Sequence, residues 1–177
     1  ESCYEPHVTS HYGASGLWQI MPITADHMKL QSIFGFEPRH DLALSTQAAL
    51  SFLQELHRTF GSWVLALAAY NAGPARVKNA LKKTKYRHDM DFFKLDLPEQ
   101  TREYVPKVLA FSQLIREHKT HQIVLPSHPD PLVKLQISKP CDFTTLALAF
   151  DCPVAVLNKF NHQYPLNAIP PAPPHPA

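Results

Sequence analysis

The residues best suited to chemistry lie at the start of the sequence, within residues 1–22. This stretch carries a carboxylate at Glu1, a hydroxyl at Ser10, and an indole and an amide at Trp18 and Gln19. Sugar rings stack on indole, and sugar hydroxyls need fixed donors and acceptors. The residue types therefore suit a cleft that binds a carbohydrate.

Four short motifs occur in one order along the first part of the chain, and together they cover roughly residues 1 to 115. Beyond the first motif, ESCYEPHVTSHYGASGLWQIMP, they are Arg39-His-Asp41 with Ser45-Thr46 and Ala48-Ala49, Ala68-Ala-Tyr-Asn-Ala-Gly73, and Thr101-Arg102 with Tyr104-Val-Pro-Lys107. This order resembles that of the lytic transglycosylases of glycoside hydrolase family 23, which cut peptidoglycan. The PARV stretch after Gly73 and the YVPK form look most like the membrane-bound lytic murein transglycosylase D branch.

The resemblance implies that one glutamate acts twice. Glu1 would donate a proton to the leaving glycosidic oxygen, and then accept the proton of the 6-hydroxyl of N-acetylmuramic acid. This attack closes a 1,6-anhydro ring, breaks the β-1,4 bond to N-acetylglucosamine and needs no water. A general acid must keep its proton near neutral pH, and burial among apolar groups raises the pKa of a glutamate. We expect no metal and no cofactor.

The resemblance also assigns supporting roles, residue by residue. Tyr70 would orient the catalytic carboxylate, and Asn71 would shape the same pocket. Ser10 and Gln19 would contact the sugar, as would Trp18. The alternative for Trp18 and Tyr70 is that they are aromatic residues of the core.

Four further positions have predicted roles. Gln100 stands where the family usually carries a glutamate, so it would contact substrate without adding a charge. Arg39 and Asp41 are predicted to form a structural ion pair that supports a loop. Ser45 is predicted to cap the helix that follows it.

An ordinary glycosidase uses a second carboxylate at a defined distance from the first. No spacing marks a partner, which slightly favours the transglycosylase over a hydrolytic lysozyme on the same fold. A non-catalytic peptidoglycan-binding protein that has kept the cleft is a further alternative. The carboxylates considered as partners are Glu5, Glu37, Asp41, Glu55 and Glu99.

Composition is that of an ordinary globular protein, with 45% hydrophobic and 18% charged residues among 177. A net charge of +2 is too small to indicate nucleic acid as a partner. The short basic run Lys82, Lys83, Lys85 and Arg87 is predicted to be a solvated loop. The partners implied are peptidoglycan glycan strands, bound by a monomer.

The sequence has no apolar run near the roughly 20 residues of a membrane span. Cys141 and Cys152 would be the natural disulfide pair, and two buried free thiols are the alternative. The resemblance implies a bacterial envelope protein of the periplasm, with lipid anchoring to the outer membrane through a region before Glu1. We therefore expect an N-terminally truncated chain, nearly inactive alone because an α-amino group on Glu1 would lower the pKa of its carboxyl.

The predicted fold class is mainly α: a lysozyme-like (goose-type, SLT) catalytic domain with a small C-terminal α/β appendage. All five glycines lie in the first 73 residues, whereas eleven of seventeen prolines lie at or after Pro126. We expect a catalytic domain over residues 1–125, a linker plus a degenerate LysM-like appendage over 126–165, and a proline-rich tail over 166–177.

Apolar spacing predicts helices over 23–30, 45–60, 63–70, 75–83 and 101–118. In the appendage we expect a strand over 132–137, helices over 143–150 and 154–160, and no closing strand. This order faintly resembles a LysM module that binds glycan, and the alternative is a small packing appendage. The usual glycine-aspartate turn of that module is replaced by Pro140-Cys-Asp142.

Overall fold

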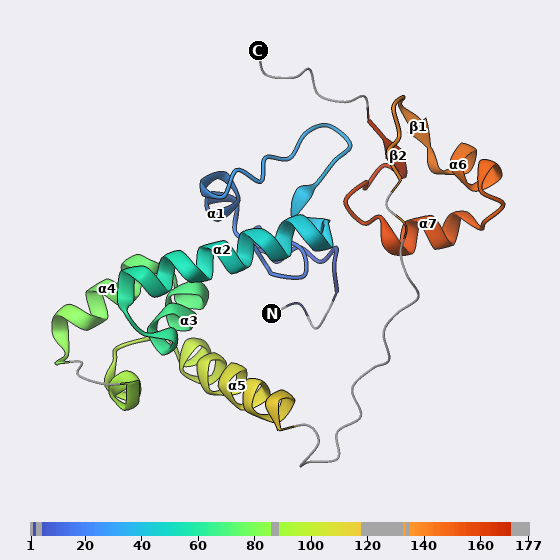
Figure 1. Ribbon diagram of the computed structural model, residues 1–177. Coiled ribbons are helices and arrows are strands. Elements are labelled where there is room, and N and C mark those ends of the chain that lie inside the picture. The colour runs from blue at the N-terminus through green and yellow to red at the C-terminus, as the bar shows by residue number, and fades with distance from the viewer. Residues whose placement is uncertain (1, 3–4, 86–88, 118–132, 134, 171–177) are drawn as a thin grey trace. The chain divides into compact units, whose positions relative to one another are not determined.

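The computed structural model describes residues 2, 5–85, 89–117, 133 and 135–170 (Figure 1). The chain divides into two compact units. The first consists of Glu1–Leu50 with Val133–Ala177, and the second of Ser51–Leu132. Helix α2 (Leu42–Phe60) begins in the first unit and ends in the second.

The second unit is a small helical assembly around α3 (Trp63–Ala72), which packs against α4 (Pro74–Lys83), η2 (Asp89–Lys94) and α5 (Glu99–Arg116). Helix α3 is apolar on most sides, as expected of a helix inside a core. Its alanines let the neighbouring helices approach closely, and Ala66, Ala68 and Ala69 are fully buried. The predicted buried helix is confirmed.

Local signals explain where these helices begin and end. The Ser62 hydroxyl accepts a hydrogen bond from the Leu65 N–H and caps α3. Gly73, with φ +90°, ends α3, and Pro74 starts α4 because a first turn needs no proline N–H. Helix α5 starts two residues before the predicted Thr101 and keeps Pro106 inside it.

In the first unit, residues 2–41 are mostly loops. They contain the short helix α1 (Pro22–His27) and the 3-10 turn η1 (Pro38–His40). A small core of Ile20, Ala25, Leu30 and Ala48 holds them together. Isolated bridges join Thr9 to Ser15 and Ser15 to Ile20, but no extended ladder forms among the described residues of this region.

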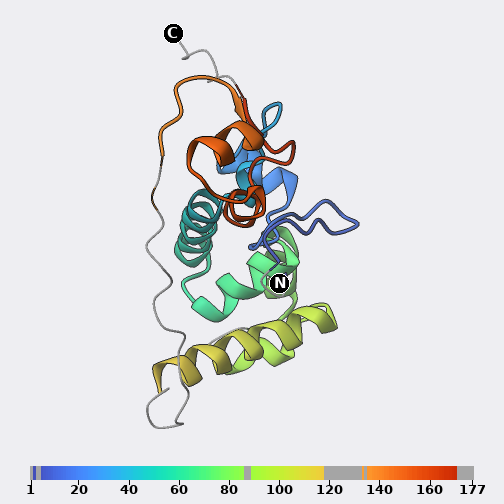
Figure 2. The ribbon, with the colours of Figure 1, turned by 90° about the vertical axis from the view of Figure 1, so that its right-hand side faces the viewer.

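The C-terminal part of the same unit has the order β1 (Cys141–Asp142), α6 (Phe143–Ala149), α7 (Val154–Phe160), β2 (Ala168–Ile169). The two predicted helices are confirmed. The strands pair antiparallel, with Cys141 opposite Ile169. In Figure 2 this part, in orange and red, lies beside the blue N-terminal loops.

Two expectations for this region are corrected, and one open alternative is decided. The described residues of the predicted strand 132–137, namely 133 and 135–137, are not in a strand. A closing strand is present, because β2 pairs with β1, and it lies inside the range expected to be a tail. Cys141 and Cys152 do not form a disulfide; both are half-buried free thiols. Residues 126–132, where the predicted linker begins, lie outside the described residues.

Ser45 does not cap α2, contrary to prediction. The helix begins at Leu42, and the Asp41 carboxylate accepts a hydrogen bond from the Leu44 N–H. The Ser45 hydroxyl instead donates to the Asp41 carbonyl at 2.6 Å from inside the first turn. Both serine and aspartate can cap a helix, and here the aspartate does so.

Within the described ranges, no single helix is long and apolar enough to cross a membrane. Helices α6 and α7 reach that length and composition only as a pair bent by 115°.

Candidate active site

Ser10 lies at the start of a tight turn that ends at Ala14. The Ser10 N–H donates to the Ala14 carbonyl at 2.7 Å, and the Ser10 hydroxyl accepts from the Ala14 N–H at 3.0 Å. Gly13, with φ +82°, allows the chain to reverse here. The Ser10 hydroxyl keeps its own proton for a further acceptor, which fits the predicted contact with a sugar.

Gln19 occupies a strained backbone position, with φ +47°. Its side-chain amide nitrogen donates to the carbonyls of Gly16 (2.9 Å) and Val8 (3.1 Å), so both amide protons are used inside the loop. The amide oxygen accepts no hydrogen bond from any described residue. The side chain is therefore held by its nitrogen and offers its oxygen as a fixed acceptor.

Trp18 is partly built into the fold. Its indole N–H donates to the Thr46 hydroxyl at 2.8 Å, and the ring packs against the small core of the first unit. This supports the alternative of a core aromatic residue, and leaves only the accessible part of the half-buried ring for a sugar. The predicted substrate contact of Trp18 stays a prediction.

Ser2, the residue next to Glu1, is hydrogen-bonded to this loop. Its side chain is buried, with 8% relative exposure, and its hydroxyl donates to the Leu17 carbonyl at 2.9 Å. Glu1 itself lies outside the described residues, so its predicted role as the acid stays a prediction.

Arg39 pairs with Glu37, not with Asp41 as predicted. Its Nε and Nη2 donate to the two Glu37 carboxylate oxygens at 2.9 and 3.0 Å. Burial alone would raise the pKa of the Glu37 carboxyl, but hydrogen bonds from Arg39 and Ser32 and the Arg39 charge lower it to about 2. The expected structural role of Arg39 holds with a different partner, since Asp41 is occupied with capping α2.

Sequence reasoning did not assign a role to Ser15 or His40. The Ser15 side chain is buried, and its hydroxyl is within hydrogen-bonding distance of Thr9 Oγ1 (2.8 Å) and His40 Nε2 (2.9 Å). Burial lowers the pKa of His40, which favours a neutral ring. The signal was present, because both residues lie within the recognised motifs.

In the second unit, Tyr70 and Asn71 follow each other near the end of α3. The Tyr70 ring packs on Phe52, with centroids 5.9 Å apart, and is half-buried. The Asn71 side-chain oxygen accepts from the hydroxyl of the buried Thr101 at 2.8 Å. Gln100 is exposed in the first turn of α5.

The predicted residues thus fall into two groups. Ser10, Trp18 and Gln19 lie on one loop of the first unit, whereas Tyr70, Asn71 and Gln100 lie on α3 and α5 of the second. An open pocket of about 360 Å³ next to α1, lined in part by Pro22, Leu30 and Arg39, contains none of them. No cluster of three or more His, Cys, Asp or Glu among the described side chains could hold a metal ion.

Solved structures with the same arrangement define the class. The chain is similar to the lytic transglycosylase Slt from Pseudomonas aeruginosa, an inactive mutant, with a TM-score of 0.57 and 31% identity over 68% of this chain and 20% of that one. It is also similar to the 70 kDa soluble lytic transglycosylase from Escherichia coli, with a TM-score of 0.56 and 39% identity over 67% of this chain and 20% of that one. The predicted fold class, the lysozyme-like fold of lytic transglycosylases, is confirmed.

Sequence comparison agrees. Residues 1–93 match the family described as Transglycosylase SLT domain. The chain is 38% identical over 165 residues to membrane-bound lytic murein transglycosylase D from Escherichia coli K12, which is 91% of this chain and 36% of that protein. It is 40% identical over 126 residues to soluble lytic murein transglycosylase from the same organism, 66% of this chain and 19% of that protein.

The chain therefore belongs to the Transglycosylase SLT domain family. It spans about a third of the length of the D-type relative and about a fifth of the soluble one.

Proposed function

We propose that this chain is the catalytic part of a peptidoglycan lytic transglycosylase. The observation that carries the proposal is its similarity, over 91% of its length, to a protein named as a lytic murein transglycosylase. The substrate would be the β-1,4 bond between N-acetylmuramic acid and N-acetylglucosamine. The product would be a 1,6-anhydromuramic acid end.

In the proposed mechanism Glu1 is the only acid and base. It protonates the leaving oxygen, then takes the proton of the 6-hydroxyl as that oxygen attacks the anomeric carbon. The inactive Pseudomonas mutant replaces one glutamate by glutamine, which supports an essential glutamate in the mechanism. The anchoring of Ser2 to Leu17 supports a fixed position for the backbone next to Glu1.

The other residues bind and orient in this proposal. The free proton of Ser10 and the amide oxygen of Gln19 would pair with sugar hydroxyl or N-acetyl groups. Tyr70 would align the Glu1 carboxyl, and Asn71, held by Thr101, would shape the pocket. Gln100 would contact substrate as a neutral group, and Trp18 would offer part of its ring face.

The proposed domain division keeps residues 1–125 as the catalytic domain and 126–165 as linker and LysM-like appendage, but it extends the appendage to Ile169, because β2 belongs to it, and shortens the tail accordingly. The β1-α6-α7-β2 order and its antiparallel pair support a LysM-like module. The relatives named as membrane-bound and soluble murein enzymes support a place in the bacterial envelope, facing the periplasm. Lipid anchoring and a monomeric state remain part of the proposal.

The test is Glu1→Gln in the full-length protein, with Glu5→Gln as the matched control because Glu5 is an exposed carboxylate nearby. We expect Glu1→Gln to stop the release of soluble muropeptides from sacculi, and Glu5→Gln to release them at the wild-type rate. Unchanged digestion by Glu1→Gln would refute the assignment of the acid.

Mass spectrometry of the products separates the enzymatic alternatives. Anhydro ends are lighter than hydrolysed ends by one water, so hydrated products would instead identify a lysozyme. A wild-type protein that sediments with sacculi but releases nothing would be a non-catalytic binding protein.

A further inference from the structure

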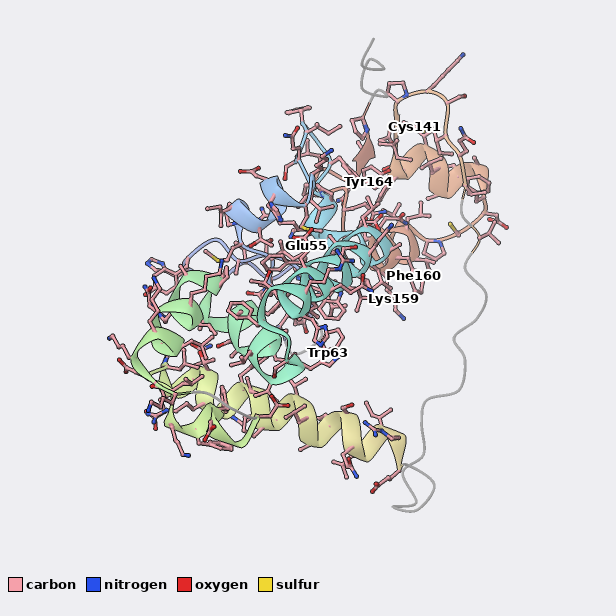
Figure 3. All side chains as sticks on the ribbon, turned by 60° about the vertical axis from the view of Figure 1, so that its left-hand side comes forward. Glu55, Trp63, Cys141, Lys159, Phe160 and Tyr164 are labelled. Atoms are coloured by element: carbon pink, nitrogen blue, oxygen red, sulfur yellow. The ribbon has the colours of Figure 1, made fainter. Side chains whose placement is uncertain are left out.

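The C-terminal part of the first unit contacts the loop before η1 through the segment that follows α7, and Pro170 lies beside Gly35 of the same loop. The Glu37 N–H donates to the Gln163 carbonyl at 2.8 Å. The rings of Phe36 and Tyr164 lie 5.4 Å apart. Tyr164, which is labelled in Figure 3, also meets Phe143 at the start of α6, with centroids 6.1 Å apart. The segment Asn161–Leu166, which follows α7, therefore connects the C-terminal module to Phe36 and Glu37.

Glu37, which contacts the C-terminal segment, also forms an ion pair with Arg39. The bidentate pair described above has only 15% and 16% side-chain exposure, so it is shielded from water and fixed in direction. The remaining guanidinium nitrogen, Nη1, donates to the Gly13 carbonyl at 3.0 Å and the Ile20 carbonyl at 3.3 Å. These two carbonyls stand at either end of the stretch that carries Trp18 and Gln19.

Two further contacts fasten the same stretch to η1. A Cβ atom on Gly16 would lie 2.0 Å from the Arg39 carbonyl oxygen, so the two backbones meet without room for any side chain. Ser15 and His40 meet through their side chains at 2.9 Å. The loop is therefore fastened to η1 by one backbone contact and one side-chain contact.

The stretch is also tied to the start of the chain through the Ser2–Leu17 hydrogen bond. A continuous path of contacts thus runs from Tyr164 and Gln163 through Glu37 and Arg39 to the loop, and from Leu17 to Ser2. Every step is a direct contact inside one compact unit.

We propose that the segment Asn161–Leu166 is a positioning element of the active site, which acts through the Glu37–Arg39 pair to hold the Gly13–Ile20 loop in its binding geometry. This inference rests on the proposed function. It gives the C-terminal module a role in turnover, separate from any binding of glycan by the module itself.

The main test compares two variants of Tyr164 in the full-length protein. Tyr164→Ala removes the ring contact with Phe36, whereas Tyr164→Phe keeps the ring. Small misplacement of groups that orient a substrate lowers turnover strongly, so we expect Tyr164→Ala to lower kcat on short soluble glycan strands on the order of tenfold. Tyr164→Phe and Leu148→Ala, an 81% exposed position on α6, should keep wild-type kcat.

Binding distinguishes positioning from glycan capture by the module. We expect Tyr164→Ala to sediment with sacculi as the wild type does. Loss of sedimentation with unchanged kcat on short strands would overturn the proposal and assign the segment to glycan binding.

A double-mutant cycle covers the case in which Tyr164→Ala disturbs the module itself. Phe36→Ala removes the same contact from the loop side and leaves α6, α7 and Tyr164 intact. If the two residues act through one contact, the double variant should lose no more than the larger single loss. Additive losses would show separate effects and overturn the proposal.

Fluorescence provides a readout that does not depend on catalysis. The chain has two tryptophans, so Trp63→Phe leaves Trp18 as the reporter of the loop. In that background Tyr164→Ala should shift the Trp18 emission and Leu148→Ala should not. If Tyr164→Ala shifts the Trp18 emission but the wild type does not digest sacculi, the proposed function is refuted and the positioning path is kept. If the wild type digests sacculi but Tyr164→Ala leaves the Trp18 emission unchanged, the positioning path is refuted.

Discussion

The interior of each compact unit is stabilised by a different kind of contact. The second unit buries large apolar side chains around α3, with Leu65, Val77, Phe92 and Val105 nearly inaccessible. The loops of the first unit surround a smaller core and are closed by directional polar contacts, above all those of Arg39. An apolar core tolerates hydrophobic substitutions that conserve its volume, whereas a fully satisfied network of hydrogen bonds specifies one arrangement. This difference suits a scaffold in one unit and a binding loop in the other.

The largest expected effect comes from a substitution that disrupts the close approach of Gly16 to Arg39 in the first unit. In Gly16→Ala the new methyl group would meet the Arg39 carbonyl oxygen at 2.0 Å, at φ +79°. We expect a loss of about 3 to 5 kcal/mol in the free energy of unfolding, since steric conflict adds to backbone strain. Urea denaturation followed by circular dichroism measures it.

Gly61→Ala is the matched control for that substitution. Gly61 also has a positive φ, +70°, but no atom of the described residues lies within 4 Å of its added Cβ. Only backbone strain of about 1 to 2 kcal/mol remains. Equal losses in the two variants would show that strain, and not the close approach of the loop to η1, makes Gly16 necessary.

The next effect tests the apolar core of the second unit. Leu65→Ala removes a side chain that is 2% exposed, and we expect a loss of about 3 kcal/mol, the usual cost of such a cavity. Leu109→Ala on α5, where the side chain is 42% exposed, should cost less than about 1 kcal/mol. Chemical denaturation of both variants measures the contrast, and similar losses would mean that α3 is not the centre of this core.

Acid should weaken the first unit through Glu37. Its pKa is lowered to about 2 in the folded state, so its ionised form contributes stability that is complete above the ordinary value of 4.5. That contribution is lost as the pH falls from 4.5 toward 2. We expect the melting temperature to fall less steeply over this range in Glu37→Gln than in the wild type. Parallel curves would show that the Arg39 pair does not stabilise the fold.

The comparison also explains what the sequence could and could not predict. Helices α3, α6 and α7 were predictable because apolar periodicity and flanking glycine, serine and proline act locally. The motif resemblance likewise predicted roles for Ser10, Gln19 and Asn71, and these roles stay predictions. The partner of Arg39 was not predictable, because Glu37 and Asp41 are both two residues away and only the fold decides between them.

Contacts between residues far apart in the sequence explain the remaining errors of prediction. Strand β2 is two residues long, and it forms because β1 pairs with it from 27 positions earlier, so no local pattern marks it. The link between Glu37 and Gln163 spans most of the chain and uses backbone groups, which every residue has. Polar contacts of this kind leave no periodic trace in a sequence.

The smallest expected effect concerns the start of α3, where Ser62 caps the central helix of the second unit. Ser62→Ala removes the acceptor of the Leu65 N–H, and we expect a loss of about 1 kcal/mol in the free energy of unfolding. Asparagine also caps helices well, so Ser62→Asn should recover most of that loss. Because the Ser62 hydroxyl also donates to Asp89 at 2.5 Å, equal losses in both variants would assign the effect to Asp89 and not to the cap.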